Sequence, residues 1–254
     1  MILSPLKYFW ILILKTYLVI KSSWREKQQG KRFDSNAISR QIYFTGVQAL
    51  PIIILVGLAL GTVVIIELST ILNSFGAGKH IERLTVIVLV RELIPIITAL
   101  IIIGRSGTAM ASELSSMKLN REIELIDSLG INIDYFLVLP RLIGTIASLV
   151  CLIFILNAVA LGGGFLFAKL FSPISHGLIF SNFIRVISLG DVCASLFKAI
   201  MFGWTITMVN CHQGLLVKKS FTEVPQTTTE GVVNSIIICF AFSIIISLYI
   251  LKAA

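Results

Sequence analysis

The stretch LVRELIPIITALIIIGRSG, residues 89–107, decides the fold class of this chain, because it is apolar enough to enter a bilayer and yet carries charges. A membrane-spanning helix needs about 20 predominantly apolar residues. Arg91, Glu92 and Arg105 interrupt the apolar run. Ionisable side chains inside a membrane are costly unless they are paired or hydrated, so they are candidates for function. The stretch therefore predicts a membrane helix with charged groups that need partners.

The composition of the 254 residues predicts an all-α integral membrane protein with a single membrane domain. The chain is 56% hydrophobic and 13% charged, whereas soluble domains carry about 25% charged residues. The longest polar stretch, residues 21–41, is too short for a separate soluble catalytic domain. The four cysteines form no CxxC pair and the three histidines are isolated. Neither a disulfide framework nor a metal site is predicted.

Five apolar windows predict five transmembrane helices. They are residues 48–72, 84–104, 142–167, 189–211 and 232–251. Of the 21 Lys and Arg residues, fourteen fall in segments on the N-terminal side of the membrane, five on the other side, and Arg91 and Lys198 inside predicted spans. The positive-inside rule then places the N-terminus and the 105–141 loop in the cytoplasm or its organellar equivalent. The net charge of +8 follows from this bias and gives no indication of nucleic-acid binding.

The N-terminal segment predicts a helix that lies in the membrane interface. Lys15 interrupts its apolar run and no A-x-A cleavage site follows, which argues against a signal peptide. Trp10, Trp24 and several lysines are typical of an interfacial amphipathic helix. We therefore divide the chain into an interfacial helix and basic segment, residues 1–45, and a membrane domain, residues 46–254. A sixth span remains the alternative for this segment.

The polar stretch ELSSMKLNREIELIDSLG, residues 113–130, predicts a short amphipathic helix on the cytoplasmic side. Four apolar residues recur at helical spacing and share one face: Leu119, Ile123, Ile126 and Leu129. Three acidic residues project elsewhere: Glu122, Glu124 and Asp127. Gly130 predicts the end of the helix. Anionic headgroups repel acidic side chains, so a protein partner is favoured over a helix resting on the bilayer.

Lys198, midway along the fourth predicted span, is the predicted partner of Glu92. Adjacent residues on a helix project about 100° apart, so Arg91 and Glu92 are poor partners for each other. Glu67 or a polar cavity is the predicted contact of Arg91. Two interpretations of the Glu92 and Lys198 pair stay open, a fixed ion pair that sets helix packing and a pair that changes during transport.

The run RELIPIITALIIIGRSGTAMASELSSMKLNREIELIDSLGINIDYFLVLPRLIG, residues 91–144, resembles the signature of MlaE-type (YrbE-type) permeases. These are the membrane subunits of ABC lipid transporters that work with MCE-domain proteins. LGDVCASLFKAIMFG, residues 189–203, and TTTEGVVNS, residues 227–235, extend the resemblance, which covers the chain from about residue 46 to the C-terminus. The chain departs from the family pattern where EIELIDSL replaces EQxDAL. It departs again before the last helix, where Ser220, Glu223 and Pro225 stand in place of glycines.

The resemblance implies a transport permease subunit that is not itself an enzyme and that forms a homodimer holding lipid, in particular phospholipid. It implies three protein partners: a separate ABC ATPase, an MCE-domain substrate-binding protein and a small STAS-type accessory subunit. No cofactor is expected, because the ATPase partner binds ATP, and the sequence contains no GxxxxGK[ST] motif. The implied location is a bacterial inner membrane or a plastid or other organelle inner envelope.

The resemblance also implies two sets of site residues besides the Glu92 and Lys198 pair. The candidates for coupling to the ATPase are Glu113, Met117, Leu119, Glu122, Ile123, Ile126 and Asp127. The candidates for lipid binding are Val64, Leu68, Ile71, Phe75, Arg91 and Leu93. Periodicity alone explains the first four of these as an ordinary packed or lipid-facing surface. Arg91 is included because a guanidinium suits bidentate contact with phosphate.

Two functions of other classes compete with this interpretation. GRSG, residues 104–107, matches the GxSG around the nucleophile of rhomboid-type intramembrane proteases, with His212 as the candidate base for Ser106. Against it, the small residues of this segment are equally explained by close helix packing, and Ser106 is expected at the membrane edge. An ATP-independent secondary transporter is the other alternative, although such folds often show internal repeats, and none was found in this sequence.

Overall fold

The computed structural model describes residues 5–28, 35–74, 81–171, 187–217 and 220–253, and within these ranges the regular structure is entirely helical. Five helical stretches in this part of the chain are long and apolar enough to cross a membrane: Ser35–Ile71, Arg83–Leu119, Asp134–Leu166, Gly190–Gly214 and Glu223–Ile250. The prediction of an all-α integral membrane protein with five spans is confirmed.

The first span is a kinked helix that extends well beyond the predicted window. Helix α2 (Ser35–Thr45) passes through the short 3-10 turn η1 (Val47–Ala49) into α3 (Leu50–Ser74). The 37 residues of this stretch measure about 55 Å at about 1.5 Å per residue, whereas the hydrocarbon core is about 30 Å thick. The predicted division between residues 45 and 46 falls at the turn between α2 and α3, within this stretch, and it stays a prediction.

The second and third spans alternate between α-helix and π-helix. The second consists of α4 (Ile81–Thr85), η3 (Val86–Leu93), α5 (Ile94–Ile102), η4 (Ile103–Gly107) and α6 (Thr108–Leu119). The third consists of η5 (Asp134–Val138), α8 (Leu139–Ala158), η6 (Val159–Gly163) and α9 (Gly164–Phe171). Short π-helical segments often occur at functional sites. Here η3 carries the Arg91 and Glu92 pair and η4 carries the GRSG segment.

The last two spans are uninterrupted helices, α11 (Leu189–Gly214) and α12 (Glu223–Ala253). A capping box between Ser188 and Asp191 fixes the start of α11. Pro225 lies in the first turn of α12, where a missing N–H is tolerated. Of the residues that replace the expected glycines, Ser220 thus lies just before α12, and Glu223 and Pro225 lie in its first turn.

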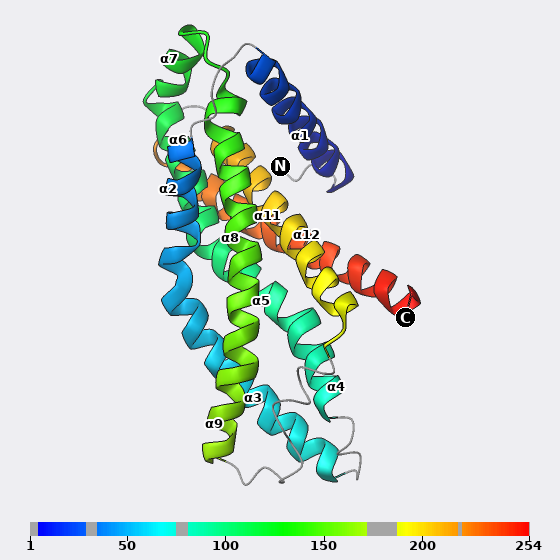
Figure 1. Ribbon diagram of the computed structural model, residues 1–254. Helices are drawn as coiled ribbons and strands as arrows, with labels where there is room; N and C mark the ends of the chain where they lie inside the picture. The colour runs from blue at the N-terminus through cyan, green and yellow to red at the C-terminus, as the bar shows by residue number, and fades with distance from the viewer. Residues whose placement is uncertain (1–4, 29–34, 75–80, 172–186, 218–219, 254) are drawn as a thin grey trace.

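Helix α11 lies at the centre of the bundle, in contact with α6, α8 and α12 (Figure 1). Figure 1 shows α2, α6 and α7 at one end of the molecule and α9 at the other. The largest fully buried side chains are Lys198 and Phe202, both on α11. The core of the bundle thus contains a lysine side chain that has no exposed surface.

Helix α1 (Pro5–Gln28) lies against the bundle through one face. Leu12 and Val19 are buried, whereas Trp10, Tyr17 and Leu18 are exposed. The Trp204 indole N–H donates a hydrogen bond to the Thr16 hydroxyl at 3.0 Å. The exposed aromatic face, together with Lys15 within the apolar run of α1, favours the interfacial helix over a sixth span.

Lys15 adds an electrostatic contact between α1 and the bundle. Partial burial lowers the pKa of the Lys15 ammonium, and the nearby Asp134 carboxylate opposes this shift. Asp134 is the first residue of η5, the element on which α1 rests. The lysine that interrupts the apolar run of this helix is therefore turned toward the protein.

Glycines allow the closest helix contact in the described part of the chain, between α3 and the η6–α9 stretch. A Cβ atom at Gly164 would lie 2.5 Å from the carbonyl carbon of Gly61, and one at Gly61 would overlap the backbone of Ala160. Small residues permit this approach, which is a common basis of helix association in membranes. Gly162, between these contacts in sequence, has open space where its Cβ would be.

We predict that Gly61→Ala destabilises the protein by about 1–3 kcal/mol, because overpacking forces the backbones of α3 and η6 apart. Gly162→Ala is the matched control and is expected to be neutral or to stabilise by up to about 1 kcal/mol, the helix propensity difference. Thermal unfolding of the purified protein in detergent measures both. An equal loss in the two variants would contradict the close contact.

Candidate functional site

A buried ammonium group joins three spans at the centre of the bundle. Lys198 has no exposed surface, and its Nζ donates three hydrogen bonds: to the Arg91 carbonyl at 2.8 Å, Glu92 Oε2 at 2.8 Å and Ser247 Oγ at 2.9 Å. An ammonium carries three donors, so every donor of Lys198 is used. The group thus fastens α11 to η3 and α12.

Glu92 receives a second contact from the last span. The Ser247 hydroxyl donates to the Glu92 carboxylate, with Oγ 2.8 Å from Oε1 and 2.9 Å from Oε2. The Glu92 side chain is 33% exposed, so the ion pair is open to its surroundings on the carboxylate side only. Ser247 is a member of this network that sequence reasoning missed. The sequence marks Ser247 only as a hydroxyl-bearing residue within an apolar helix.

Arg91 is placed differently from its prediction. Its Nε lies 4.0 Å from Glu92 Oε1, at the limit of an ion pair, and Nη2 is buried without a hydrogen bond. Arg91 is 8% exposed, whereas Glu67, its expected partner, is exposed. A long flexible side chain and the smaller turn per residue of a π-helix bring adjacent residues closer than the 100° spacing of an α-helix allows.

The predicted lipid-binding residues fall into different environments. Val64 and Leu93 are partly buried against the same apolar core, and Leu68 is half-buried. Ile71 is 47% exposed, and Phe75 lies outside the described residues. The structure therefore brings Val64 and Leu93 to one cluster, and it shows Ile71 at the molecular surface.

The predicted cytoplasmic helix exists but is shorter than expected. Arg121 adopts a left-handed conformation at φ 61° and separates α6 from α7 (Glu122–Ser128). Gly130, at φ 73°, follows the end of α7, as predicted. Leu119 and Leu129 lie outside α7 and therefore do not belong to its apolar face.

The surface of α7 that is open to a partner differs from the one predicted. Ile123 is buried and Ile126 and Met117 pack against the apolar cluster at this end of the bundle. Leu125 and Leu129 are 61% and 68% exposed. The acidic residues Glu122, Glu124 and Asp127 are also exposed. The isoleucines anchor α7 to the bundle, so the open surface is formed by two leucines and the acidic side chains.

The GRSG segment lacks the contact that a protease needs. Ser106 is fully buried within the protein, and its Oγ makes no hydrogen bond. A serine nucleophile requires a base within hydrogen-bond reach. Gly107 instead allows a close approach of the Asn210 side chain, whose Nδ2 would lie 2.9 Å from a Cβ at this position. The segment therefore serves helix packing.

The fold and this network define the class of protein: a polytopic membrane subunit whose spans are joined by buried charges. The family model of the MlaE permease matches residues 38–249. The chain therefore belongs to the MlaE permease family, as the resemblance in residues 91–144 predicted.

Named relatives support this assignment. A probable ABC transporter permease protein of Rickettsia typhi is 30% identical over 85% of this chain and 83% of its own length. The Arabidopsis thaliana protein trigalactosyldiacylglycerol 1, chloroplastic, is 25% identical over 99% of this chain and 71% of its own. The Haemophilus influenzae intermembrane phospholipid transport system permease protein MlaE is 26% identical over 82% and 80% of the two chains.

We predict that Lys198→Ala destabilises the protein by about 3–5 kcal/mol, because it leaves the Glu92 carboxylate without its cation. Lys198→Met combined with Glu92→Gln should recover most of this loss, since it removes both charges at similar volume. Thermal unfolding of Lys198→Met, Glu92→Gln and the double variant in detergent gives the coupling energy between the two side chains. Additive effects of the two substitutions would contradict a direct interaction.

Proposed function

We propose that this chain is the permease subunit of an ABC-type lipid transporter, that its cargo is phospholipid, and that it works as a homodimer. The observation that carries the proposal is the match of residues 38–249 to the MlaE permease family. The phospholipid cargo is supported by the name of the Haemophilus influenzae relative, an intermembrane phospholipid transport system permease protein. The subunit is a transport protein and not an enzyme.

We further propose that α7 receives the motion of a separate ATPase. Leu125 and three acidic side chains of this short helix, and Leu129 directly after it, are exposed at the end of the bundle that the charge distribution predicts to be cytoplasmic. Ile123 fixes α7 to the bundle, and α7 follows α6 directly along the second span. A push on α7 would thus pass through the turn at Asn120 and Arg121 into α6, and from there along the second span to η3 and the Lys198 network.

An MCE-domain protein on the opposite side of the membrane and a small STAS-type subunit complete the proposed assembly. Lipid would occupy a space between the two protomers, bordered by Val64 and Leu93 near the buried Arg91. The relatives come from bacteria and from a plant chloroplast. They support a bacterial inner membrane or a plastid inner envelope as the location.

We predict that reversing two charges on α7, Glu122→Lys with Asp127→Lys, abolishes co-purification of the ATPase and leaves membrane insertion intact. Both carboxylates are exposed and make no ion pair with a described residue, so their loss does not disturb the bundle. Glu230→Lys, an exposed acid on α12, is the matched control and should retain the ATPase. Undiminished recovery of the ATPase with the double variant would contradict the role of α7.

The composition of the complex provides the test of the whole proposal. We expect native mass spectrometry of the tagged protein, gently extracted from its own membrane, to show two copies of this chain with an ATPase subunit and retained phospholipid. Recovery of a monomer without an ATPase would contradict it and would favour the ATP-independent transporter.

A further inference from the structure

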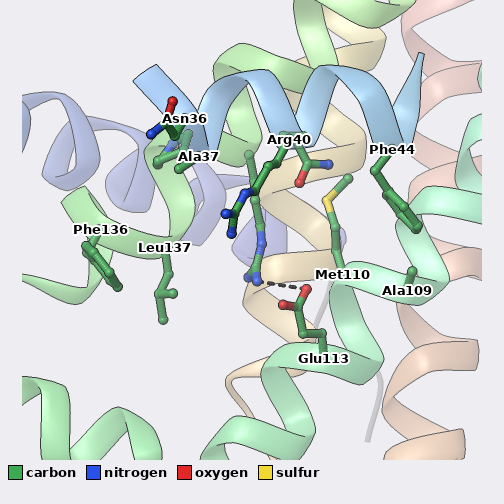
Figure 2. A pocket seen from close by; sticks show the side chains of 12 residues that line it. Asn36, Ala37, Arg40, Phe44, Ala109, Met110, Glu113, Phe136 and Leu137 are labelled. Carbon is green, nitrogen blue, oxygen red and sulfur yellow. Dashed lines mark ion pairs between the residues drawn. The ribbon is translucent and has the colours of Figure 1, made fainter. Parts of the chain in front are cut away.

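A cavity of about 690 Å³ opens beside α2 at the cytoplasmic end of the bundle, apart from the Lys198 network. Its walls come from three elements that are distant in sequence: α2, α6 and the η5–α8 junction (Figure 2). The volume lies within the usual range of ligand-binding pockets, about 300–1,000 Å³. No role follows for this cavity from the function proposed above.

The spacing along the second span places the cavity just beyond the end of the apolar window. Arg105 follows the apolar window of residues 84–104 and hydrogen-bonds the Phe44 carbonyl at 2.7 Å and Gln48 Oε1 at 2.6 Å. Ala109 and Glu113, on the cavity wall, follow Arg105 by one and two turns of helix. These residues therefore lie about 6 and 12 Å beyond the apolar window, where the polar layer of a bilayer begins.

The lining combines apolar walls with an excess of positive charge. Phe44, Phe136 and Leu137 supply apolar surface, and Phe136 is 47% exposed. Two arginines, Arg40 and Arg141, line the same cavity as one carboxylate, Glu113. Figure 2 shows Arg40 on α2 and Glu113 on α6 across from each other, with Phe44 and Phe136 at the rim. An amphiphile with a negative headgroup matches this distribution.

Arg141 provides an incompletely used donor group. Its side chain is nine-tenths buried, and Nη2 lies 2.9 Å from Glu113 Oε2. The other terminal nitrogen, Nη1, is buried without an oxygen or nitrogen acceptor, and the guanidinium makes its further side-chain hydrogen bond with the Cys211 thiol, which is a weak acceptor. Buried guanidinium donors are normally satisfied. A phosphate oxygen is an acceptor of the geometry and charge that a guanidinium binds well.

We propose that this cavity binds the phosphodiester headgroup of a membrane phospholipid from the cytoplasmic leaflet, with Arg40 and Arg141 as the phosphate contacts. The acyl chains would leave past Phe44 and Phe136 into the bilayer. The site is complete within one protomer and needs no ATPase. It therefore does not rest on the proposed transport function, and either proposal can fail without the other.

The test is photocrosslinking from the cavity rim. The full-length protein carries p-benzoylphenylalanine in place of Phe136. It is reconstituted in nanodiscs that contain equal amounts of phosphatidylglycerol and diacylglycerol. After illumination, mass spectrometry identifies and quantifies the lipid adducts. The same photoprobe at Phe154, an exposed position on α8 within the apolar span, reports the bulk lipid. We expect phosphatidylglycerol to exceed diacylglycerol by about tenfold at Phe136, relative to Phe154, as one charge-assisted hydrogen bond allows.

Two substitutions and one control variant separate the effect of charge on lipid binding from the effect of cavity shape. Arg40→Gln should return the ratio at Phe136 to the bulk value, whereas Arg121→Gln, an exposed arginine outside the cavity, should leave it unchanged. Ala37→Phe fills the cavity without changing its charge and should reduce the total adduct. Both arginine variants change exposed side chains, so they are expected to fold.

Three results would overturn the proposal. One is a ratio at Phe136 equal to that at Phe154. Another is a ratio that Arg40→Gln and Arg121→Gln leave equally high. The third is an adduct at Phe136 that Ala37→Phe leaves undiminished, because it would show that the crosslinked lipid does not enter the cavity.

Discussion

The hydrogen bonding of Lys198 is the constraint on which the membrane part of this structure depends. An ammonium without exposed surface is tolerated in an apolar bundle only if its three donors are satisfied. The acceptors come from the Arg91 backbone, the Glu92 carboxylate and the Ser247 hydroxyl. Since η3, α11 and α12 must all be in register for these bonds to form, the charged group determines how three of the five spans pack.

A π-helix at Arg91 and Glu92 links this packing to the proposed function. The second span carries the charged pair in η3 and the small residues of η4, and it is followed by α7, for which we propose contact with the ATPase. Because these elements follow one another along a single stretch of chain, movement at the cytoplasmic surface has a continuous route to the buried charges. An ion pair that is open to its surroundings on the Glu92 side can respond to such a movement.

At the end of the bundle where α2 meets α6, arginines pair with acceptors from other elements. Arg105 and Arg141 both lie there, each with an acceptor from another element, Phe44 and Glu113 respectively. Arginines at this level can reach both protein acceptors and lipid phosphates, because the environment changes from hydrocarbon to headgroups. Two of the basic residues counted for the positive-inside bias thus make specific contacts, which join α2 to the second span and the second span to the third.

The sequence by itself determined the fold class, the five spans and the family, because these depend on composition, apolar run length and motif spacing, which are local properties of the chain. It also singled out Glu92 and Lys198, since charges within apolar runs are rare, and the structure places them 2.8 Å apart. Tertiary structure alone decided that Ser247 joins this pair and that Ile123 faces inward. It also formed a cavity from Arg40 and Arg141. The physical reason is that these contacts connect residues far apart in the chain, 155 positions for Glu92 and Ser247, and helical periodicity carries no information on which faces meet.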